Sequence, residues 1–490
     1  MTPPPPPVPE PDAQPKADTK TDASTGTGTG TDSDSDSDAD ADATVRKARR
    51  RYITVCALFW LPIGLTIAPL VLLFTERGMA LTAVAGFFAA HSLTTALLEL
   101  PTGGLSDVIG RRAVLAAAGL LNAVAFTFQA LGTTAWALTV GMALMGAARA
   151  LSSGPAEAWY VDTVQAARGP GAELRTGLAR GGAAVSAALA VGTLVGGGVP
   201  WLLGLGPDPG ERLREATSGA VLPLSVPPLM GSAVALVFVA YVLAVLREPG
   251  RPSVTPAGVL RGVPATVVAG LRLGGRNALV RRVLLSAAAA GGGLATVELL
   301  VPGRAAALTG APESGAVLFA GLACTGFVCS ALGNQLAPLT ARLTGSGERA
   351  VLASLSVCAA GLLLLGVTST ATGGAPLALA ATGYGLLYLG LGAAGPNEND
   401  LLHRSVTSAG RATALSVQSL ALQLAGVVAG LTVTALAAGP LPWLLVSAVL
   451  FAAALLWTRR VSGAGPGPSP EATGDRATEP ARPVAQGRPG

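Results

Sequence analysis

The chain has 490 residues, of which 50% are hydrophobic and only 12% are charged, whereas soluble domains usually carry about 25% charged residues. This composition excludes an ordinary soluble protein, and the long unbroken apolar runs indicate a helical membrane protein. The net charge of +5 combines an acidic N-terminal segment with a basic remainder. Because the basic residues fall in loops between apolar runs, we expect no nucleic-acid partner.

Residues 1–44 consist of a proline run, Thr-Gly repeats and Ser-Asp repeats. Such a segment cannot bury a hydrophobic core, so we expect a disordered acidic tail. The Pro- and Gly-rich residues 459–490 are expected to form a second disordered tail. Two histidines and four cysteines occur without metal-ligand spacing, so the sequence predicts neither a metal site nor a cofactor.

Twelve apolar runs between the two tails are long enough to cross a bilayer as single helices, which takes about 20 residues. These runs lie at 52–74, 81–102, 113–132, 134–157, 175–204, 226–246, 282–302, 314–338, 350–369, 375–396, 411–438 and 440–458. The sequence therefore predicts an all-α membrane protein with an N-terminal six-helix half (45–246), a linker (247–281) and a C-terminal six-helix half (282–458).

Lysines and arginines concentrate in alternate loops of this arrangement, beginning with the cluster at 46–51 and including the long linker. The loops on the opposite side hold only Arg77, Arg212, Arg214 and Arg304. Cytoplasmic loops are enriched in Lys and Arg, so we expect both termini in the cytoplasm of a plasma-membrane protein.

The stretch from Gly103 to Arg112 forms a short charged turn between the second and third runs. Its pattern Gly-x-Leu-x-Asp-x-x-Gly-Arg-Arg resembles the signature loop of the major facilitator superfamily. The preceding Glu99-Leu100-Pro101-Thr102 resembles the drug-exporter branches of that family. A loop that only sets orientation would explain the arginines, but it would explain neither Asp107 nor the glycine spacing.

The resemblance implies two six-helix halves that rock about a central site, with the loop acting as a gate. Asp107 would then face the start of the eleventh helix near 410–413, and Arg111 or Arg112 would pair with Asp162 after the fourth span. The glycines permit close helix approach and a tight reversal of the chain. The expected gating residues are Gly103, Asp107, Gly110, Arg111, Arg112 and Asp162.

Ionisable residues inside the membrane are costly and are candidates for function. The candidates for proton coupling are His91, Glu99, Arg149 and Glu298. Arg149 partly resembles the arginine of a family motif linked to proton coupling. Three of them have a plainer alternative: helix-packing hydrogen bonds for His91, an ion pair with Glu99 or Glu157 for Arg149, and an interfacial position for Glu298.

The first, fourth, seventh and tenth spans are expected to line a central cavity, where Trp60, Thr66, Tyr384 and Tyr388 are the polar or aromatic residues at suitable depth. They could equally be ordinary packing residues. A cavity with so few polar groups suits an amphipathic or lipophilic solute.

These features predict a monomeric, proton-coupled exporter of small amphipathic compounds, with a small-molecule substrate, protons and the lipid bilayer as its partners. A metabolite importer of the same fold is the alternative, and a non-transporting membrane receptor or enzyme is a third possibility. The sequence has no clustered catalytic residues and no Gly-x-x-x-x-Gly-Lys-Ser/Thr loop, so we do not expect an enzyme.

Overall fold

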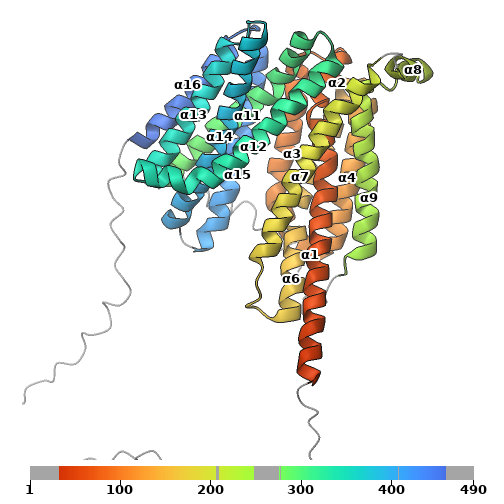
Figure 1. The fold of residues 1–490 in the computed structure, drawn as a ribbon, viewed down its shortest axis with the longest axis vertical. Coiled ribbons are helices and arrows are strands. Elements are labelled where there is room, and N and C mark those ends of the chain that lie inside the picture. Colours follow the sequence, from red (N-terminus) through yellow and green to blue (C-terminus); the bar gives the residue numbers. More distant parts are fainter. Residues whose placement is uncertain (1–31, 206–208, 248–274, 276, 407, 459–490) are drawn as a thin grey trace, which may run out of the picture.

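The computed structural model describes residues 32–205, 209–247, 275, 277–406 and 408–458, without the side chains of 32–38, 100–108 and 408–413. The described chain forms twelve spans that are long and apolar enough to cross a membrane. The predicted all-α fold with twelve transmembrane helices is therefore confirmed. Two bundles, one from each half of the sequence, stand side by side (Figure 1).

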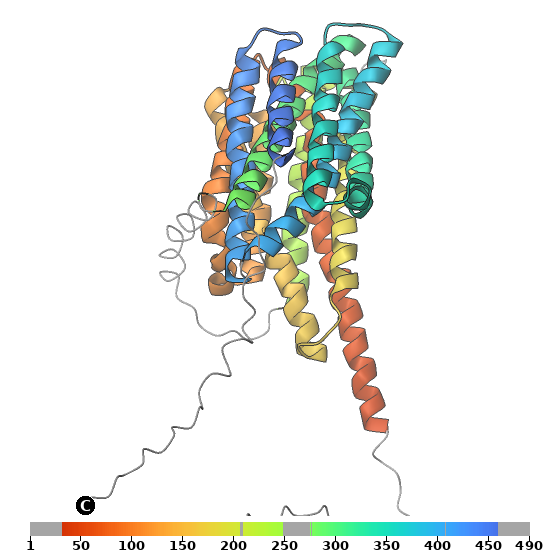
Figure 2. The same ribbon diagram turned by 90° about the vertical axis from the view of Figure 1, so that its left-hand side faces the viewer.

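The N-terminal bundle begins with a long helix that reaches beyond the rest of the fold (Figure 2). Its helices are α1 (Asp32–Ile67), α2 (Leu70–Glu76), α3 (Leu81–Ile109), α4 (Arg111–Leu131), α5 (Ala135–Ser152), α6 (Pro155–Arg168), α7 (Arg175–Leu203), α8 (Pro209–Ala216) and α9 (Val226–Val245), with a 3₁₀ turn at Pro223–Ser225.

The C-terminal bundle contains the remaining spans. Its helices are α11 (Ala278–Thr309), α12 (Pro312–Thr344), α13 (Gly347–Val367), α14 (Gly374–Ser405), α15 (Ser408–Ala435) and α16 (Leu441–Leu455), followed by a 3₁₀ turn at Leu456–Thr458. Since the number of spans is even, the described chain begins and ends on the same side of the molecule. We call this the terminal side and the opposite one the α8 side.

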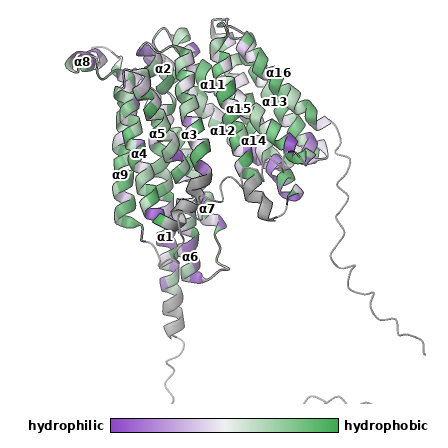
Figure 3. Cartoon of the chain, turned by 180° about the vertical axis from the view of Figure 1, so that it is seen from behind, coloured by the Kyte–Doolittle hydropathy of each residue, from purple (hydrophilic) through white to green (hydrophobic). Residues whose placement is uncertain are grey.

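Hydrophobic residues cover the length of the helices, and hydrophilic residues gather near their ends (Figure 3). Large apolar side chains such as Val428 and Val367 are about two-thirds exposed, at 65% and 66%. Because hydrocarbon tails solvate such side chains as well as a protein core does, this pattern is typical of helices that face lipid.

The two bundles meet along two helix pairs, α3 with α15 and α7 with α12. Small residues allow the second pair to approach closely. A Cβ atom added at Gly197 of α7 would lie 2.6 Å from both the Ala316 carbonyl oxygen and the Ala320 Cβ of α12. Gly197 therefore lets the fifth span lie directly against the eighth. Gly192 and Gly196 instead pack against α1.

A buried apolar cluster joins the halves on the α8 side. It includes Leu73, Phe74 and Leu138 of the N-terminal half together with Leu299 and Ala316 of the C-terminal half. The side chains of Leu73 and Phe74 are fully buried. Apolar burial of this kind excludes water, so the molecule is closed on the α8 side in this conformation.

Some expected boundaries differ from the structure, and two of them change its description most. α1 begins at Asp32, inside the segment expected to be disordered. Aspartates suit the positive end of a helix dipole, and Asp42 forms an ion pair with Arg168 that fixes this extension against α6. The expected turn at 103–112 is also mostly helical, since α3 continues through Ile109. The reversal is confined to Gly110, which has φ +116°.

Two spans are interrupted by helix breaks. In the first, α1 ends at Ile67 and the chain continues as α2 after Pro69. Pro69 cannot donate a backbone hydrogen bond, so the helix is interrupted there. The fourth span runs past its expected end because α6 follows α5 almost at once. Between them Gly154 has φ +94°, a conformation that favours glycine, and Pro155 begins α6.

Candidate functional site

A cavity of about 370 Å³ lies between the two halves, within the membrane-spanning part of the fold. This volume falls in the range of roughly 300–1,000 Å³ typical of small-molecule sites. All four residues expected at a central cavity, Trp60, Thr66, Tyr384 and Tyr388, line it. The first, fourth, seventh and tenth spans contribute as expected, and α3, α7 and α12 also form its wall.

Aromatic and sulfur-containing side chains dominate this wall. Phe88 comes from α3, Met142 and Met145 come from α5, and Phe319 and Phe327 come from α12. Such side chains offer a large polarisable surface with few hydrogen-bonding groups. The wall therefore suits a flat or flexible apolar group better than a sugar or a phosphate.

The two cavity tyrosines on α14 form a stacked pair. The ring centroids of Tyr384 and Tyr388 are 5.0 Å apart, and their planes differ by 27°. A Cβ added at Gly326 of α12 would lie 2.7 Å from Tyr384 and 3.0 Å from Tyr388. A glycine at this position of α12 thus makes room for the aromatic pair at the cavity wall.

Two of the ionisable candidates also face the cavity. His91 and Glu298 line it from opposite halves of the molecule. Glu298 is exposed, although it lies well inside the span formed by α11. It also lines a smaller cavity of about 130 Å³ between α3, α11 and α15, which it shares with Ser92 and Gln423. The Glu298 side chain therefore borders both cavities.

The other two candidates lie beside the cavity. The guanidinium carbon of Arg149 is 4.6 Å from the centroid of the Trp60 ring, a cation–π contact. Arg149 also interacts electrostatically with Glu99 and His91. Glu99 accepts hydrogen bonds from Ser419 Oγ at 3.3 Å and from Gln423 Nε2 at 3.2 Å, both on α15 of the other half.

The expected gating residues fall in two groups. Arg111 forms an ion pair with Asp162, the acid expected as its partner, and Arg112 donates to the Leu243 carbonyl. Both contacts lie within the N-terminal half, where they hold α4 against α6 and α9. The backbone of Gly103 and Asp107 belongs to α3, but the side chain of Asp107 and the residues at 410–413 lie outside the side chains that the structure describes.

We expect Arg111→Ala to lower the free energy of unfolding by about 1 kcal/mol, because Asp162 loses its charged partner while remaining half exposed. The double variant Arg111→Asp/Asp162→Arg should recover most of this loss. Chemical denaturation in detergent would measure it. Arg404→Ala is the matched control, since Arg404 pairs with the exposed Asp400 at 2.9 Å and should change little. Equal losses of unfolding free energy in Arg111→Ala and Arg404→Ala would contradict the view that the Arg111–Asp162 ion pair holds α4 against α6.

A charged cluster lies on the α8 side, at the end of α2 and the start of α12. Glu76 accepts a hydrogen bond from Arg214 at 2.7 Å, and its second carboxylate oxygen is buried without a hydrogen-bond partner. Burial, and after it the negative charge of Glu313, raises the pKa of the Glu76 carboxyl above its usual value, while Arg214 opposes this effect. Glu313 belongs to α12, so the two acids face each other across the halves.

The pH dependence of stability should reflect this cluster. Because the folded state raises the pKa of Glu76 above its usual 4.5, the folded state holds the proton more tightly, and stability should fall as pH rises through that window. Thermal unfolding midpoints of wild type and Glu76→Gln, measured across pH in detergent, should therefore converge at low pH and separate at higher pH, with the variant more stable. Glu211→Gln, which changes the other acid near Arg214, is the control. Parallel pH curves for wild type and Glu76→Gln would contradict this expectation.

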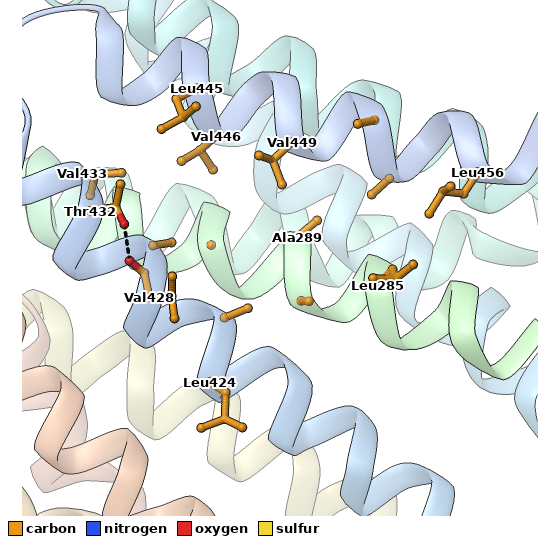
Figure 4. A pocket seen from close by; sticks show the side chains of 16 residues that line it. Leu285, Ala289, Leu424, Val428, Thr432, Val433, Leu445, Val446, Val449 and Leu456 are labelled. Atoms are coloured by element: carbon orange, nitrogen blue, oxygen red, sulfur yellow. Dashed lines mark hydrogen bonds between the residues drawn. The ribbon is translucent and has the colours of Figure 1, made fainter. Parts of the chain in front are cut away.

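A larger groove of about 680 Å³ lies away from this site, between α11, α15 and α16 (Figure 4). Its lining is apolar, including Leu285, Val428 and Val449. Its one hydroxyl group, on Thr432, donates to the Val428 carbonyl at 2.7 Å. A wall without free polar groups cannot orient a substrate, so we place the candidate site in the central cavity instead.

Several residues of the site escaped the sequence analysis. Ser92 lines both cavities, and the polar pair His91-Ser92 within an apolar run was a usable signal. Ser419 and Gln423 contact Glu99 from α15, but no local pattern connects residues so distant in sequence. The methionines and phenylalanines of the wall are indistinguishable in sequence from ordinary packing residues.

No protein-family model matches the chain, and no curated protein matches it. Solved structures, in contrast, match the chain. The crystal structure of the nucleoside transporter NupG (D323A mutant) matches with a TM-score of 0.66 and 11% identity, over 84% of this chain and 99% of that one. The D-xylose-proton symporter matches with a TM-score of 0.63 and 16% identity, over 83% and 96%. The peptide transporter POT in complex with sulfate matches with a TM-score of 0.59 and 15% identity, over 84% and 94%.

These similarities are far too low in sequence identity to carry substrate or mechanism, but they extend over nearly the whole of each compared chain. The fold of twelve spans in two bundles is therefore one that solved structures share. The chain has the fold of the major facilitator superfamily of membrane transporters.

Proposed function

We propose that this protein is a secondary active transporter that moves a small amphipathic or lipophilic solute across the plasma membrane by alternating access. The observation that carries this proposal is the central cavity, which lies between two bundles and at membrane depth. Rocking of one bundle against the other would expose such a site to each side in turn. The described conformation is closed on the α8 side by the shared apolar cluster.

The composition of the wall supports the substrate class. Phenylalanine, methionine and tyrosine side chains would contact an apolar body, and Glu298 offers a carboxylate for a basic group. An ionised carboxylate in an apolar cavity attracts a cation and repels an anion. An amphipathic solute with a protonatable amine fits this combination.

Proton coupling would run through Glu298, with His91 as the facing group on the other half. A single carboxylate that binds either a proton or a cationic substrate makes the two exchange with each other. With the terminal side in the cytoplasm, as the distribution of arginines predicts, this exchange would drive export. Asp107, together with the ion pair of Arg111 and Asp162, would form the gate on that side.

Import of a polar metabolite is the second candidate, and two of the similar structures raise it. One is a D-xylose-proton symporter and another is a nucleoside transporter. Those names describe the compared proteins, whose identity to this chain is 16% or lower. The apolar wall of this cavity argues for a less polar solute than a sugar.

Reconstituted protein in proteoliposomes with an acidic lumen tests the proposal. Lumenal pH would be followed while four classes of solute are added: amphipathic amines, nucleosides, sugars and dipeptides. A rise in lumenal pH with the amines, absent from protein-free liposomes corrected for passive amine entry, supports proton-coupled exchange. A response confined to nucleosides, sugars or dipeptides would overturn the substrate class. No response to any of them would overturn the transport function.

A further inference from the structure

Glu99 ties the two halves of the molecule together. Its Oε2 atom accepts hydrogen bonds from Ser419 Oγ at 3.3 Å and from Gln423 Nε2 at 3.2 Å. Gln423 Nε2 also lies 3.2 Å from Ser419 Oγ, so the two donors form one unit on α15. Glu99 belongs to α3, and α3 with α15 is one of the two seams between the bundles. This carboxylate is therefore a direct polar contact across a seam that rocking must change.

A cation within the same half competes for this carboxylate. Arg149 interacts electrostatically with Glu99, yet its guanidinium lies over the ring of Trp60. α3 and α5, which carry Glu99 and Arg149, are locked together one turn away, where Thr95 Oγ1 donates to the Gly146 carbonyl at 3.1 Å. The backbone thus holds the two charged residues at a fixed spacing, and only the side chains can rearrange.

Trp60 connects this arrangement to the cavity. Its ring lines the central cavity and at the same time holds the Arg149 guanidinium. A ligand that packs against the cavity side of the ring would shift the ring and weaken its contact with the guanidinium. A released guanidinium binds a carboxylate more strongly than a hydroxyl or an amide does, because both partners are then charged.

We propose that Trp60, Arg149 and Glu99 form a relay that reports occupancy of the cavity to the α3–α15 seam. A ligand on Trp60 displaces Arg149, Arg149 draws Glu99 toward itself, and Glu99 releases Ser419 and Gln423. Loss of these bonds frees the seam to separate. The relay rests on the proposed transport function for its purpose, but the side-chain competition itself requires no transport.

Substitutions at Trp60 test the relay without a known substrate. Spin labels at Leu97 of α3 and Leu415 of α15, both exposed, would report the width of the seam by pulsed electron paramagnetic resonance on purified protein. Trp60→Leu removes the aromatic face and should shift the distance distribution to longer values. Trp60→Phe keeps the face and should restore the wild-type distribution.

The second arm tests whether Glu99 carries the effect. Adding Glu99→Gln to Trp60→Leu should return the seam to its wild-type width, because the amide oxygen still accepts from Ser419 and Gln423 but no longer attracts Arg149. Gln423→Ala should widen the seam by itself. Gln418→Ala is the matched control on the same helix, since Gln418 donates to Glu398 within the C-terminal half at 3.4 Å.

A label-to-label distance in Trp60→Leu equal to that of wild type would overturn the relay. A distance in Trp60→Leu/Glu99→Gln as long as that in Trp60→Leu alone would also overturn it. These outcomes are independent of the proteoliposome assay. A protein that shows the relay but moves no solute would refute the proposed function and leave the relay standing. A protein that transports solute but shows no change in seam width in Trp60→Leu would refute the relay and leave the proposed function standing.

Discussion

Glu298→Gln should reduce proton-driven transport by more than about tenfold, a coupling free energy of about 1.4 kcal/mol or more. Glu298 is the carboxylate that lines the central cavity, and it is exposed there. The amide cannot release a proton, so the cycle loses its coupled step. Exchange of labelled for unlabelled solute at equal pH needs no proton movement and should continue at saturating solute, although the amide lowers the affinity for a basic group.

The comparison between uphill transport and exchange is the measurement for this variant, carried out in proteoliposomes with a solute identified by the pH assay. Glu215→Gln on α8 is the control, because it removes an exposed carboxylate far from the cavity. If Glu298→Gln retained the pH dependence of uphill transport, Glu298 would not be the coupling residue. If it lost exchange as well, the carboxylate would serve substrate binding alone.

Gly197→Val should abolish transport almost completely while the protein still folds. A side chain at Gly197 would meet the Ala316 carbonyl and the Ala320 methyl at 2.6 Å, so α7 and α12 cannot keep their present contact. The closed α8 side would be excluded, and the protein would be held open on that side. Solute flux per mole of reconstituted protein would measure the loss.

The neighbouring glycine gives a matched control for this variant. A Cβ at Gly198 meets nothing within 4 Å, although Gly198 lies on the same helix and has the same cost of helix formation. Gly198→Val should therefore transport at close to the wild-type rate. Equal losses in both variants would show that valine harms α7 in general and that the close contact with α12 has no special role.

The sequence predicted those features of the fold that depend on neighbouring residues in the chain. The length of each apolar run determines whether it crosses a bilayer, so all twelve spans were found. Depth along a span also follows from residue number, which is why Trp60 and Tyr384, chosen for their depth on separate spans, line one cavity. Their role in substrate binding remains a proposal.

Helix ends were less predictable, because polar residues are compatible with both a loop and a solvated helix. The charged stretch ending at Ile109 continues α3, and the aspartates from Asp32 onward begin α1. Contacts between the halves were out of reach for a different reason. Glu99 meets Gln423 only because two separately folded bundles pack together, and no periodicity in either segment encodes that contact.

Alternating access of the central cavity can be tested directly by labelling one position from each side of the membrane. A single cysteine at Ser92, which lines both central cavities, would be placed in a background where Cys56, Cys324, Cys329 and Cys358 are replaced. A membrane-impermeant maleimide would then be added to one face of oriented vesicles at a time. The account predicts preferential labelling from the terminal side in the otherwise native protein and from the α8 side once Gly197→Val is added. Labelling from the same side in both proteins would contradict it.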